Sequence, residues 1–181
     1  MFTAIAIDDV QLLPLEDDHT DSLFALVDAN RAHLRQWLGW VDATTGPDTV
    51  LEFIAASRAC RANRTGYDAG IWQDDELVGV IGLDGLNWQD RKTGLGYWLA
   101  APHQGRGIMT RSCKVLIDFC FTRLDLNRVQ IRCAPDNARS RAIPEHLGFI
   151  QEGILRQSAW LYDRFIDQVV YGLLRTEWSG V

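Results

Sequence analysis

A segment with two glycines at residues 103–110, HQGRGIMT, constrains the fold of this chain more than any other stretch. It follows the strand-like residues 96–99 and precedes a long helix-like run that begins near Thr110. Gly105 and Gly107 can take positive φ, and their lack of Cβ atoms lets a ligand approach the backbone. The helix behind them directs free N–H groups and a partial positive charge of about half a unit at that ligand. The sequence therefore predicts a strand, a tight loop and a helix that bind a pyrophosphate.

Two common phosphate-binding motifs do not match this segment, because the residues that they require do not follow it. A P-loop needs a lysine followed by serine or threonine after its last glycine. A dinucleotide-binding loop needs a third glycine and, about 20 positions later, an acidic residue at the end of a second strand. Neither pattern follows Gly107. The segment therefore favours a different phosphate-bearing ligand.

The composition is that of one globular domain. The chain has 181 residues, of which 47% are hydrophobic and 23% are charged, so a single core over residues 1–181 is expected. No apolar run approaches the roughly 20 residues of a membrane span, and residues 1–4 lack a basic segment that leads into an apolar one. We therefore expect a cytoplasmic protein with no membrane partner.

The net charge and the spacing of the cysteines argue against nucleic-acid binding, disulfide bonds and a metal site. A formal net charge of −6 argues against nucleic acid as a partner and favours cationic substrates. The 4 cysteines are Cys60, Cys113, Cys120 and Cys133, and none of them forms a C-x-x-C pair. We therefore expect reduced thiols rather than disulfides, and no metal site.

Hydrophobic spacing predicts helices and strands in alternation. Helices are expected at residues 17–29 and 31–38, from 47, from 110 and at 137–147, and strands at 68–73, 77–83, 94–99, 128–133, 149–156 and 167–174. A turn at residues 74–76 would join the first two of these strands as a hairpin. An antiparallel sheet joined to a strand-helix-strand crossover has α+β character.

Short motifs spread over nearly the whole chain together resemble one enzyme family. They lie at residues 32–40, 96–99, 104–109, 136–140, 147–149, 152–153 and 177–178. In this combination they are similar to the ribosomal-protein-serine/alanine N-acetyltransferases, a branch of the GNAT superfamily. The resemblance implies a single-domain GNAT fold with a mixed, mostly antiparallel sheet of about seven strands and flanking helices. Strands four and five would separate into a V-shaped cleft, which acetyl-CoA enters from one side and the amine acceptor from the other.

The resemblance also implies which residues bind acetyl-CoA. They are Leu99, Gln104, Gly105, Arg106, Gly107, Ile108, Met109, Thr110, Arg111, Asn137 and Ser140. Backbone N–H groups of the loop would hold the pyrophosphate, and Arg106 and Arg111 would add positive charge. Leu99 would pair its backbone with the pantetheine arm, which Asn137 would also bind. A tight loop with solvated arginines, and an Asn137 that only caps its helix, are the alternatives.

The catalytic residues follow from the same resemblance. Ser140 would protonate the leaving thiolate, because Pro144 stands where many relatives have a tyrosine as general acid. Gly94 and Ala159 stand where relatives have glutamates that act as general base. Asp84 could replace these glutamates through a water molecule, or could only cap a turn.

The amine acceptor would contact side chains from the early helices and the hairpin. The candidates are Trp37, Trp40, Asn87, Trp88 and Tyr97. Tryptophans can also simply fill a core. Tyr97 is the first choice, because its strand would lie beside the cofactor. Cys133 would face the same cleft, either as a small buried residue or as a thiol able to form a mixed disulfide with coenzyme A.

The implied reaction is direct attack of a neutral amine on the acetyl group, with no covalent enzyme intermediate. An α-amino group has a pKa near 8, so roughly one-tenth of it is neutral at pH 7, whereas a lysine near 10.4 is neutral about one time in two thousand. The first acceptor expected is therefore the α-amine of a protein, a ribosomal one above all. The alternatives are a small amine (a polyamine, an amino sugar or an amino-acid derivative) and an acetyl-CoA-binding module without turnover. A homodimer would suit exposed aromatic strands near the C-terminus.

Overall fold

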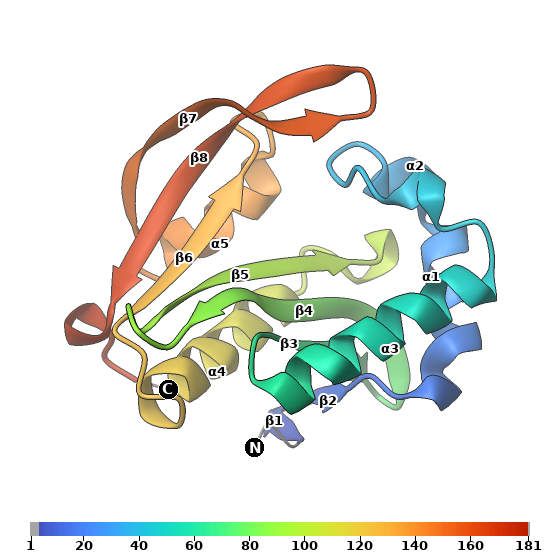
Figure 1. Cartoon of the computed structure of the whole chain (residues 1–181), viewed down its shortest axis with the longest axis horizontal. Coiled ribbons are helices and arrows are strands. Elements are labelled where there is room, and N and C mark those ends of the chain that lie inside the picture. Colours follow the sequence, from blue (N-terminus) through green and yellow to red (C-terminus); the bar gives the residue numbers. More distant parts are fainter. Residues whose placement is uncertain (1–3, 181) are drawn as a thin grey trace.

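The computed structural model describes residues 4–180, whose backbone forms one mixed sheet flanked by helices (Figure 1). The sheet has 8 strands in the order β1-β2-β3-β4-β5-β6-β8-β7. They are β1 (Ile5–Ile7), β2 (Val10–Pro14), β3 (Tyr67–Gln73), β4 (Glu76–Asn87), β5 (Lys92–Leu99), β6 (Arg128–Cys133), β7 (Ile150–Leu161) and β8 (Arg164–Leu174). Neighbouring strands are antiparallel except for β5 and β6, which are parallel. This confirms the expected α+β architecture.

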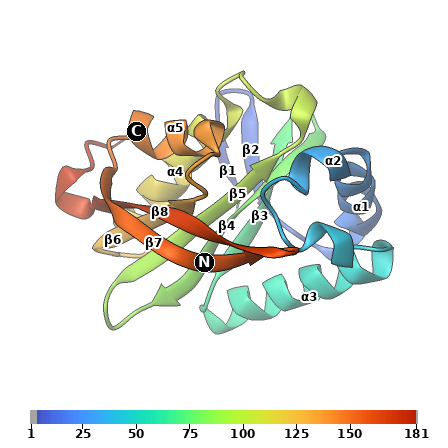
Figure 2. The ribbon, with the colours of Figure 1, turned by 90° about the horizontal axis from the view of Figure 1, so that it is seen from above.

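The helices cover both faces of this sheet. They are α1 (Thr20–Ala29), α2 (Arg31–Leu34), α3 (Pro47–Asn63), α4 (Ile108–Thr122) and α5 (Ala138–His146). Figure 2 shows α1, α2 and α3 on one side of the sheet and α4 and α5 on the other. Pro47 suits the first turn of α3, where its missing N–H would have no helical partner. Arg64 ends that helix in the left-handed conformation, with φ 57°.

Each face of the sheet buries its own apolar cluster. Leu116 of α4 packs in the cluster that contains Ile81 of β4, whereas Ile54 of α3 packs in the cluster that contains Val80. Successive side chains of a strand point to opposite faces, so neighbours in sequence belong to different clusters. The same alternation along β5 separates side chains that face α4 and α5 from side chains that face α1 and α3.

Strands β5 and β6 separate along their length. Their pairing joins Lys92 with Arg128, Thr93 with Val129 and Gly94 with Gln130. Residues 95–99 of β5 pair with β4 alone, and β6 continues beside β8 (Figure 1). The strand β5 leads into the glycine segment and β6 leads into α5, so the N-terminal ends of α4 and α5 both follow the open end of the V.

The N-terminal hairpin of β1 and β2 is absent from the expectations drawn from the sequence. It adds two strands to the six that hydrophobic spacing predicts, so the sheet has 8 strands where the family resemblance implies about seven. The split lies between the fifth and sixth strands of the chain rather than the fourth and fifth. Strand β1 has 3 residues, too few for a visible alternation. Val10 and Leu12 of β2 are fully buried, but this burial comes from pairing with the distant β3.

The other expected elements all form, with displaced ends. The helix α4 begins at Ile108 rather than 110, and β4 extends to Asn87. The helix α2 ends at Leu34, and turns replace the rest of the expected segment 31–38. Within residues 4–180, none of the helices combines the length and the apolarity that crossing a bilayer requires.

Candidate active site

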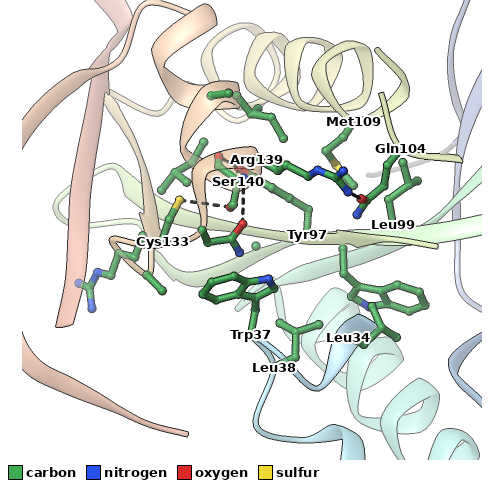
Figure 3. Close-up of a pocket in the computed structure, with 18 of the residues that line it drawn as sticks. Leu34, Trp37, Leu38, Tyr97, Leu99, Gln104, Met109, Cys133, Arg139 and Ser140 are labelled. Atoms are coloured by element: carbon green, nitrogen blue, oxygen red, sulfur yellow. Dashed lines mark hydrogen bonds between the residues drawn. The ribbon is translucent and has the colours of Figure 1, made fainter. Parts of the chain in front are cut away.

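A cleft of about 900 Å³ opens between the separated strands. Its walls come from β5, the glycine segment, the first turn of α4, the end of β6, α5, the segment around α2 and the β7–β8 hairpin. Figure 3 shows side chains that enter it from the segment around α2, from β5, from the glycine segment and from α4, β6 and α5. The volume lies within the range of ligand pockets, roughly 300–1,000 Å³. Of the residues expected in the site, Trp37, Trp40, Tyr97, Leu99, Gln104, Gly105, Gly107, Ile108, Met109, Thr110, Asn137 and Ser140 line the cleft.

The glycine segment has the backbone that its sequence predicts. Gly105 and Gly107 take φ of 75° and 72°, in the left-handed region that favours glycine. A Cβ at Gly105 would meet no atom within 4 Å, so the backbone there is open to a ligand. The helix α4 makes its first hydrogen bond from Arg111 N–H to the Gly107 carbonyl, which leaves the N–H groups of the first helical turn free. A row of free donors at a helix N-terminus fits the pyrophosphate of acetyl-CoA.

The side chain of Gln104 connects both sides of the cleft mouth. Its Nε2 lies 2.7 Å from Nε2 of His33 at α2. Its Oε1 accepts a hydrogen bond from Arg139 of α5 (Figure 3). Both His33 and Arg139 line the cleft, and neither is among the residues expected from the sequence. They come from segments far apart in the chain, so no local sequence signal brings them together.

The two arginines expected at the phosphates do not line the cleft. The side chain of Arg111 pairs with Asp9, with 2.9 Å between Nη2 and Oδ1, and its Nη1 donates to the Arg106 carbonyl at 3.2 Å. Arg106 is exposed. Arg111 thus pairs with groups of its own chain rather than with the cleft. The reason is that the β1–β2 turn, which contains Asp9, lies beside the first turn of α4.

Asn137 has the capping role that was one of its two expected readings. Its Oδ1 accepts a hydrogen bond from the Ser140 N–H at 3.1 Å and so begins α5. Asn137 also lines the cleft. Its contact with the pantetheine arm therefore stays a prediction.

Ser140, Tyr97 and Cys133 form a hydrogen-bonded group in the cleft (Figure 3). The Ser140 hydroxyl lies 3.3 Å from Sγ of Cys133 and 3.4 Å from the Tyr97 hydroxyl, which itself donates to the Ser140 carbonyl at 3.0 Å. Burial raises the pKa of Tyr97 and the pKa of the Cys133 thiol. Both groups therefore stay protonated near neutral pH, and the Ser140 hydroxyl has a fixed position.

Tyr97 lies on the opposite face of β5 from Trp98, and its contact with an acceptor stays a prediction. It packs beside the cluster under α4, whereas its neighbour Trp98 packs beside the cluster under α1 and α3. The ring of Trp98 lies 6.0 Å from that of Trp40, and both line the cleft with Trp37. Strand alternation is the reason, since consecutive side chains of β5 face opposite sides.

Asn87 and Trp88 are not in the cleft, which corrects the expectation for both. The Trp88 Nε1 donates to the Arg64 carbonyl at 2.7 Å, and Asn87 accepts a hydrogen bond from the Asp90 N–H at 2.7 Å. They lie at the turn that joins β4 to β5, at the end where β5 and β6 are still paired. The cleft opens at the other end of β5.

Asp84 lies beside the cleft floor rather than in its lining. It is the cross-strand partner of Gly94, and its Oδ2 is 3.2 Å from the place where a Cβ at Gly96 would lie. Gly96 lines the cleft. Desolvation raises the pKa of Asp84, although the residue keeps solvent contact. Its carboxyl thus occupies space over β5 that a side chain at Gly94 or Gly96 would otherwise take.

A second carboxyl adjoins Asp84 on the same face of the sheet. Asp68 of β3 lies over Gly82, where a Cβ would come within 2.2 Å of its Oδ1, and Gly82 pairs directly with Gly96. Burial raises the pKa of Asp68, a hydrogen bond with Ser57 lowers it, and the charge of Asp84 raises it further. Asp68 is not among the residues expected from the sequence, because only the sheet register brings it near Asp84.

Comparison with known proteins agrees with this geometry. The family model described as "Acetyltransferase (GNAT) domain" matches residues 9–150. The putative ribosomal N-acetyltransferase YdaF of Bacillus subtilis (strain 168) is 36% identical over 181 residues, 99% of each chain. The ribosomal-protein-serine acetyltransferase of Escherichia coli (strain K12) is 28% identical over 162 residues, 90% of each chain.

A solved structure shares the same fold. It is RimL, a ribosomal L7/L12 alpha-N-protein acetyltransferase, in a complex with coenzyme A that is linked to a cysteine by a disulfide. The TM-score is 0.92 at 26% identity, over 94% of this chain and 97% of that chain. The split sheet, the glycine segment and the extent of these matches lead to one conclusion. The chain belongs to the GNAT acetyltransferase family and is an acetyl-CoA-dependent N-acetyltransferase.

Proposed function

We propose that the acceptor is the N-terminal α-amine of a protein, with ribosomal proteins as the first class to test. The names of the relatives support this proposal. The observation that carries it is the charge of the cleft. Its described lining contains Arg132 and Arg139 but no aspartate or glutamate, despite the net charge of −6 of the whole chain. A polyamine has several positive charges and would need carboxylates around it. A single neutral amine does not.

The acceptor side of the cleft also suits the end of a peptide. Trp37, Trp40, Trp98 and Trp160 line it. Large aromatic side chains bind apolar and small side chains through contact area rather than charge. An extended peptide could place its first residues along these rings while its α-amine reaches the thioester between β5 and β6.

In the proposed mechanism, acetyl-CoA supplies an acetyl group that its thioester activates toward amines. The backbone N–H groups of residues 105–110 and the edge of β5 at Leu99 would hold it, and positioning would supply much of the rate. The amine nitrogen forms a bond to the acetyl carbon as the carbon–sulfur bond breaks. Asp84, through a water molecule, receives the proton that the amine loses. The Ser140 hydroxyl donates its proton to the departing thiolate and takes one back from solvent water. Asp84 releases the proton that it received to solvent, so the enzyme ends the cycle with its starting protonation.

The weak base at this site is sufficient for an α-amine. With a pKa near 8, roughly one-tenth of such an amine is already neutral at pH 7. Asp84 then needs only to accept a proton after attack, which a carboxylate can do from a positively charged nitrogen. A lysine acceptor, neutral about one time in two thousand, would need a stronger base in contact with it.

A panel of acceptors tests the proposal. Release of coenzyme A would be followed with a thiol reagent for peptides that begin with serine or alanine, for the same peptides with blocked N-termini, for spermidine and for an amino sugar. We expect turnover on the free peptides and none on the blocked ones. Turnover confined to spermidine or the amino sugar would establish a small-amine acceptor instead. Acetyl-CoA binding without turnover on any acceptor would indicate a binding module.

Two further expectations belong to this proposal. Modification of ribosomal proteins with acetyl-CoA would take place in the cytoplasm. A homodimer would cover apolar side chains that β7 and β8 expose, among them Ile150, Ile154 and Phe165.

A further inference from the structure

An unbroken set of hydrogen bonds runs from β3 to the glycine segment. The Gln73 Nε2 donates to Oδ2 of Asp9 at 2.5 Å, and the Arg111 Nη2 donates to Oδ1 of Asp9 at 2.9 Å. The Arg111 Nη1 then donates to the Arg106 carbonyl at 3.2 Å. Asp9 lies in the turn between β1 and β2, the hairpin that the sequence pattern does not predict. This hairpin therefore contacts the glycine segment through one guanidinium group.

The last of these bonds fixes the direction of a neighbouring N–H. In a trans peptide the carbonyl and the following N–H point in opposite directions, and the described chain contains no cis peptide. The Arg106 carbonyl points at Arg111, so the Gly107 N–H points away from Arg111. Gly107 lines the cleft, whereas Arg106 and Arg111 do not. The Gly107 N–H is thus directed to the cleft side of the segment.

Packing at Gly107 depends on the same guanidinium. A Cβ at Gly107 would lie 3.2 Å from Nη1 of Arg111, closer than an ordinary contact. Glycine at this position therefore serves both the positive φ of 72° and the approach of Arg111. The Arg111 side chain as a whole is mostly buried, with 27% of its area exposed.

We propose that Asp9 is a positioning residue for acetyl-CoA, which acts through Arg111 to hold the Arg106–Gly107 peptide with its N–H toward the pyrophosphate. The inference rests on the proposed binding of acetyl-CoA at residues 105–110. Without the Asp9 carboxylate, the guanidinium loses its hydrogen-bonded anion and keeps only the more distant Asp8, and the peptide can rotate, so that a carbonyl oxygen faces the phosphate in place of a donor. The cost falls on cofactor affinity and not on the acetyl transfer step, since neither residue touches the thioester region around Ser140.

The variant Asp9→Asn tests this inference, with Asp8→Asn as its matched control. Asp8 adjoins Asp9, but its side chain is 72% exposed and its Oδ2 lies 3.8 Å from Nε of Arg111. Its φ of 51° is one that asparagine also tolerates. We expect Asp9→Asn to raise the Kd of acetyl-CoA in calorimetry about three- to tenfold with kcat unchanged at saturation. Asp8→Asn should stay close to the parent protein.

Two further measurements separate positioning from a general loss of structure. S-acetylpantetheine lacks the pyrophosphate, so kcat/KM for this donor should be equal in Asp9→Asn and in the parent protein. In an Arg111→Gln background, Asp9→Asn should have no additional effect on the Kd of acetyl-CoA. Parent-like affinity in Asp9→Asn, or an equal loss with S-acetylpantetheine, would overturn the inference. A parent protein that fails to bind acetyl-CoA would instead contradict the proposed function itself.

Discussion

At the scale of single residues, the chemistry of the site depends on the hydrogen bonds among the Ser140 hydroxyl, the Tyr97 hydroxyl and the Cys133 thiol. The Ser140 hydroxyl contacts Tyr97 and Cys133, whose pKa values burial raises. Neither neighbour can take the proton of Ser140 near neutral pH. In the proposed mechanism the Ser140 hydroxyl exchanges its hydrogen bond to Cys133 or Tyr97 for one to the thiolate that leaves, and the cap from Asn137 holds its backbone in place.

We expect Ser140→Ala to lower kcat about 100-fold while the KM for acetyl-CoA changes little, because only the leaving thiolate needs this proton. The cap uses the backbone N–H of residue 140, so α5 should remain intact. Steady-state kinetics with a peptide acceptor check this, with Ser22→Ala on the exposed side of α1 as control. A variant at full rate would remove Ser140 from the chemistry.

At the scale of secondary-structure elements, three neighbouring strands place two carboxyls on the face of the sheet that packs against α1 and α3. Asp68 lies over Gly82, and Asp84 lies close to Gly96. Because Gly82 and Gly96 are paired, the two Cβ positions that the carboxyls replace are only about 5 Å apart. Glycines on β4 and β5 thus provide the room for acidic side chains from the neighbouring strands.

The pH dependence of catalysis should show Asp84 as a base. The neutral fraction of the amine gives log kcat/KM a slope of one below pH 8, and protonation of Asp84 adds a second slope at lower pH. Desolvation raises the pKa of Asp84, so this steeper limb should begin above the ordinary aspartate value of 3.8. In Asp84→Asn we expect a single slope and a rate about tenfold lower at pH 7. Asp163→Asn, in the exposed β7–β8 turn, is the control. An unchanged profile would exclude Asp84.

Asp68 should make the protein less stable as the pH rises, whereas an acid whose pKa is lowered by folding makes it more stable. Burial, the first cause, raises its pKa above the value of the unfolded chain, so the folded state binds its proton more tightly. This contribution to stability is present at low pH and is lost as pH rises through the folded pKa. We expect Asp68→Asn to gain stability relative to the parent protein as the pH rises from about 4, near the ordinary aspartate value of 3.8, to about 8. Urea unfolding at both pH values measures this. An equal difference at both would contradict it.

At the scale of the whole molecule, the β7–β8 hairpin forms one wall of the cleft. The Tyr162 hydroxyl donates to the Leu38 carbonyl at 2.6 Å, and the Arg35 guanidinium lies 3.9 Å above the ring of Tyr162. Trp160 stands in this wall, and its ring lies 4.8 Å from that of Phe165. The hairpin also exposes apolar surface, since 59% of Phe165 and 52% of Ile154 are accessible.

We expect this surface to be covered by a second copy of the chain. Sedimentation at micromolar concentrations should show a dimer, and Phe165→Glu should weaken it, because a charge cannot be buried there without a partner. Arg164→Glu, at the neighbouring exposed position, is the control for added negative charge. A monomer at every concentration would contradict the expectation.

The sequence by itself determined the local structure and the family. Gly105 and Gly107 predict the loop because positive φ is a property of the residue, and hydrophobic spacing predicts α3, α4 and the central strands because burial follows a local period. The spread of short motifs indicated the GNAT family, which the comparisons confirm. None of these inferences needs two distant segments to meet.

Only the tertiary structure decided which side chains meet. Strand alternation and register placed Tyr97 with Ser140, excluded Trp88 from the cleft and brought Asp68 beside Asp84. The β1–β2 hairpin and its link from Asp9 to the glycine segment came from pairing with β3 across more than fifty residues of sequence. Such contacts depend on long-range packing and loop closure, which no local pattern of residues encodes.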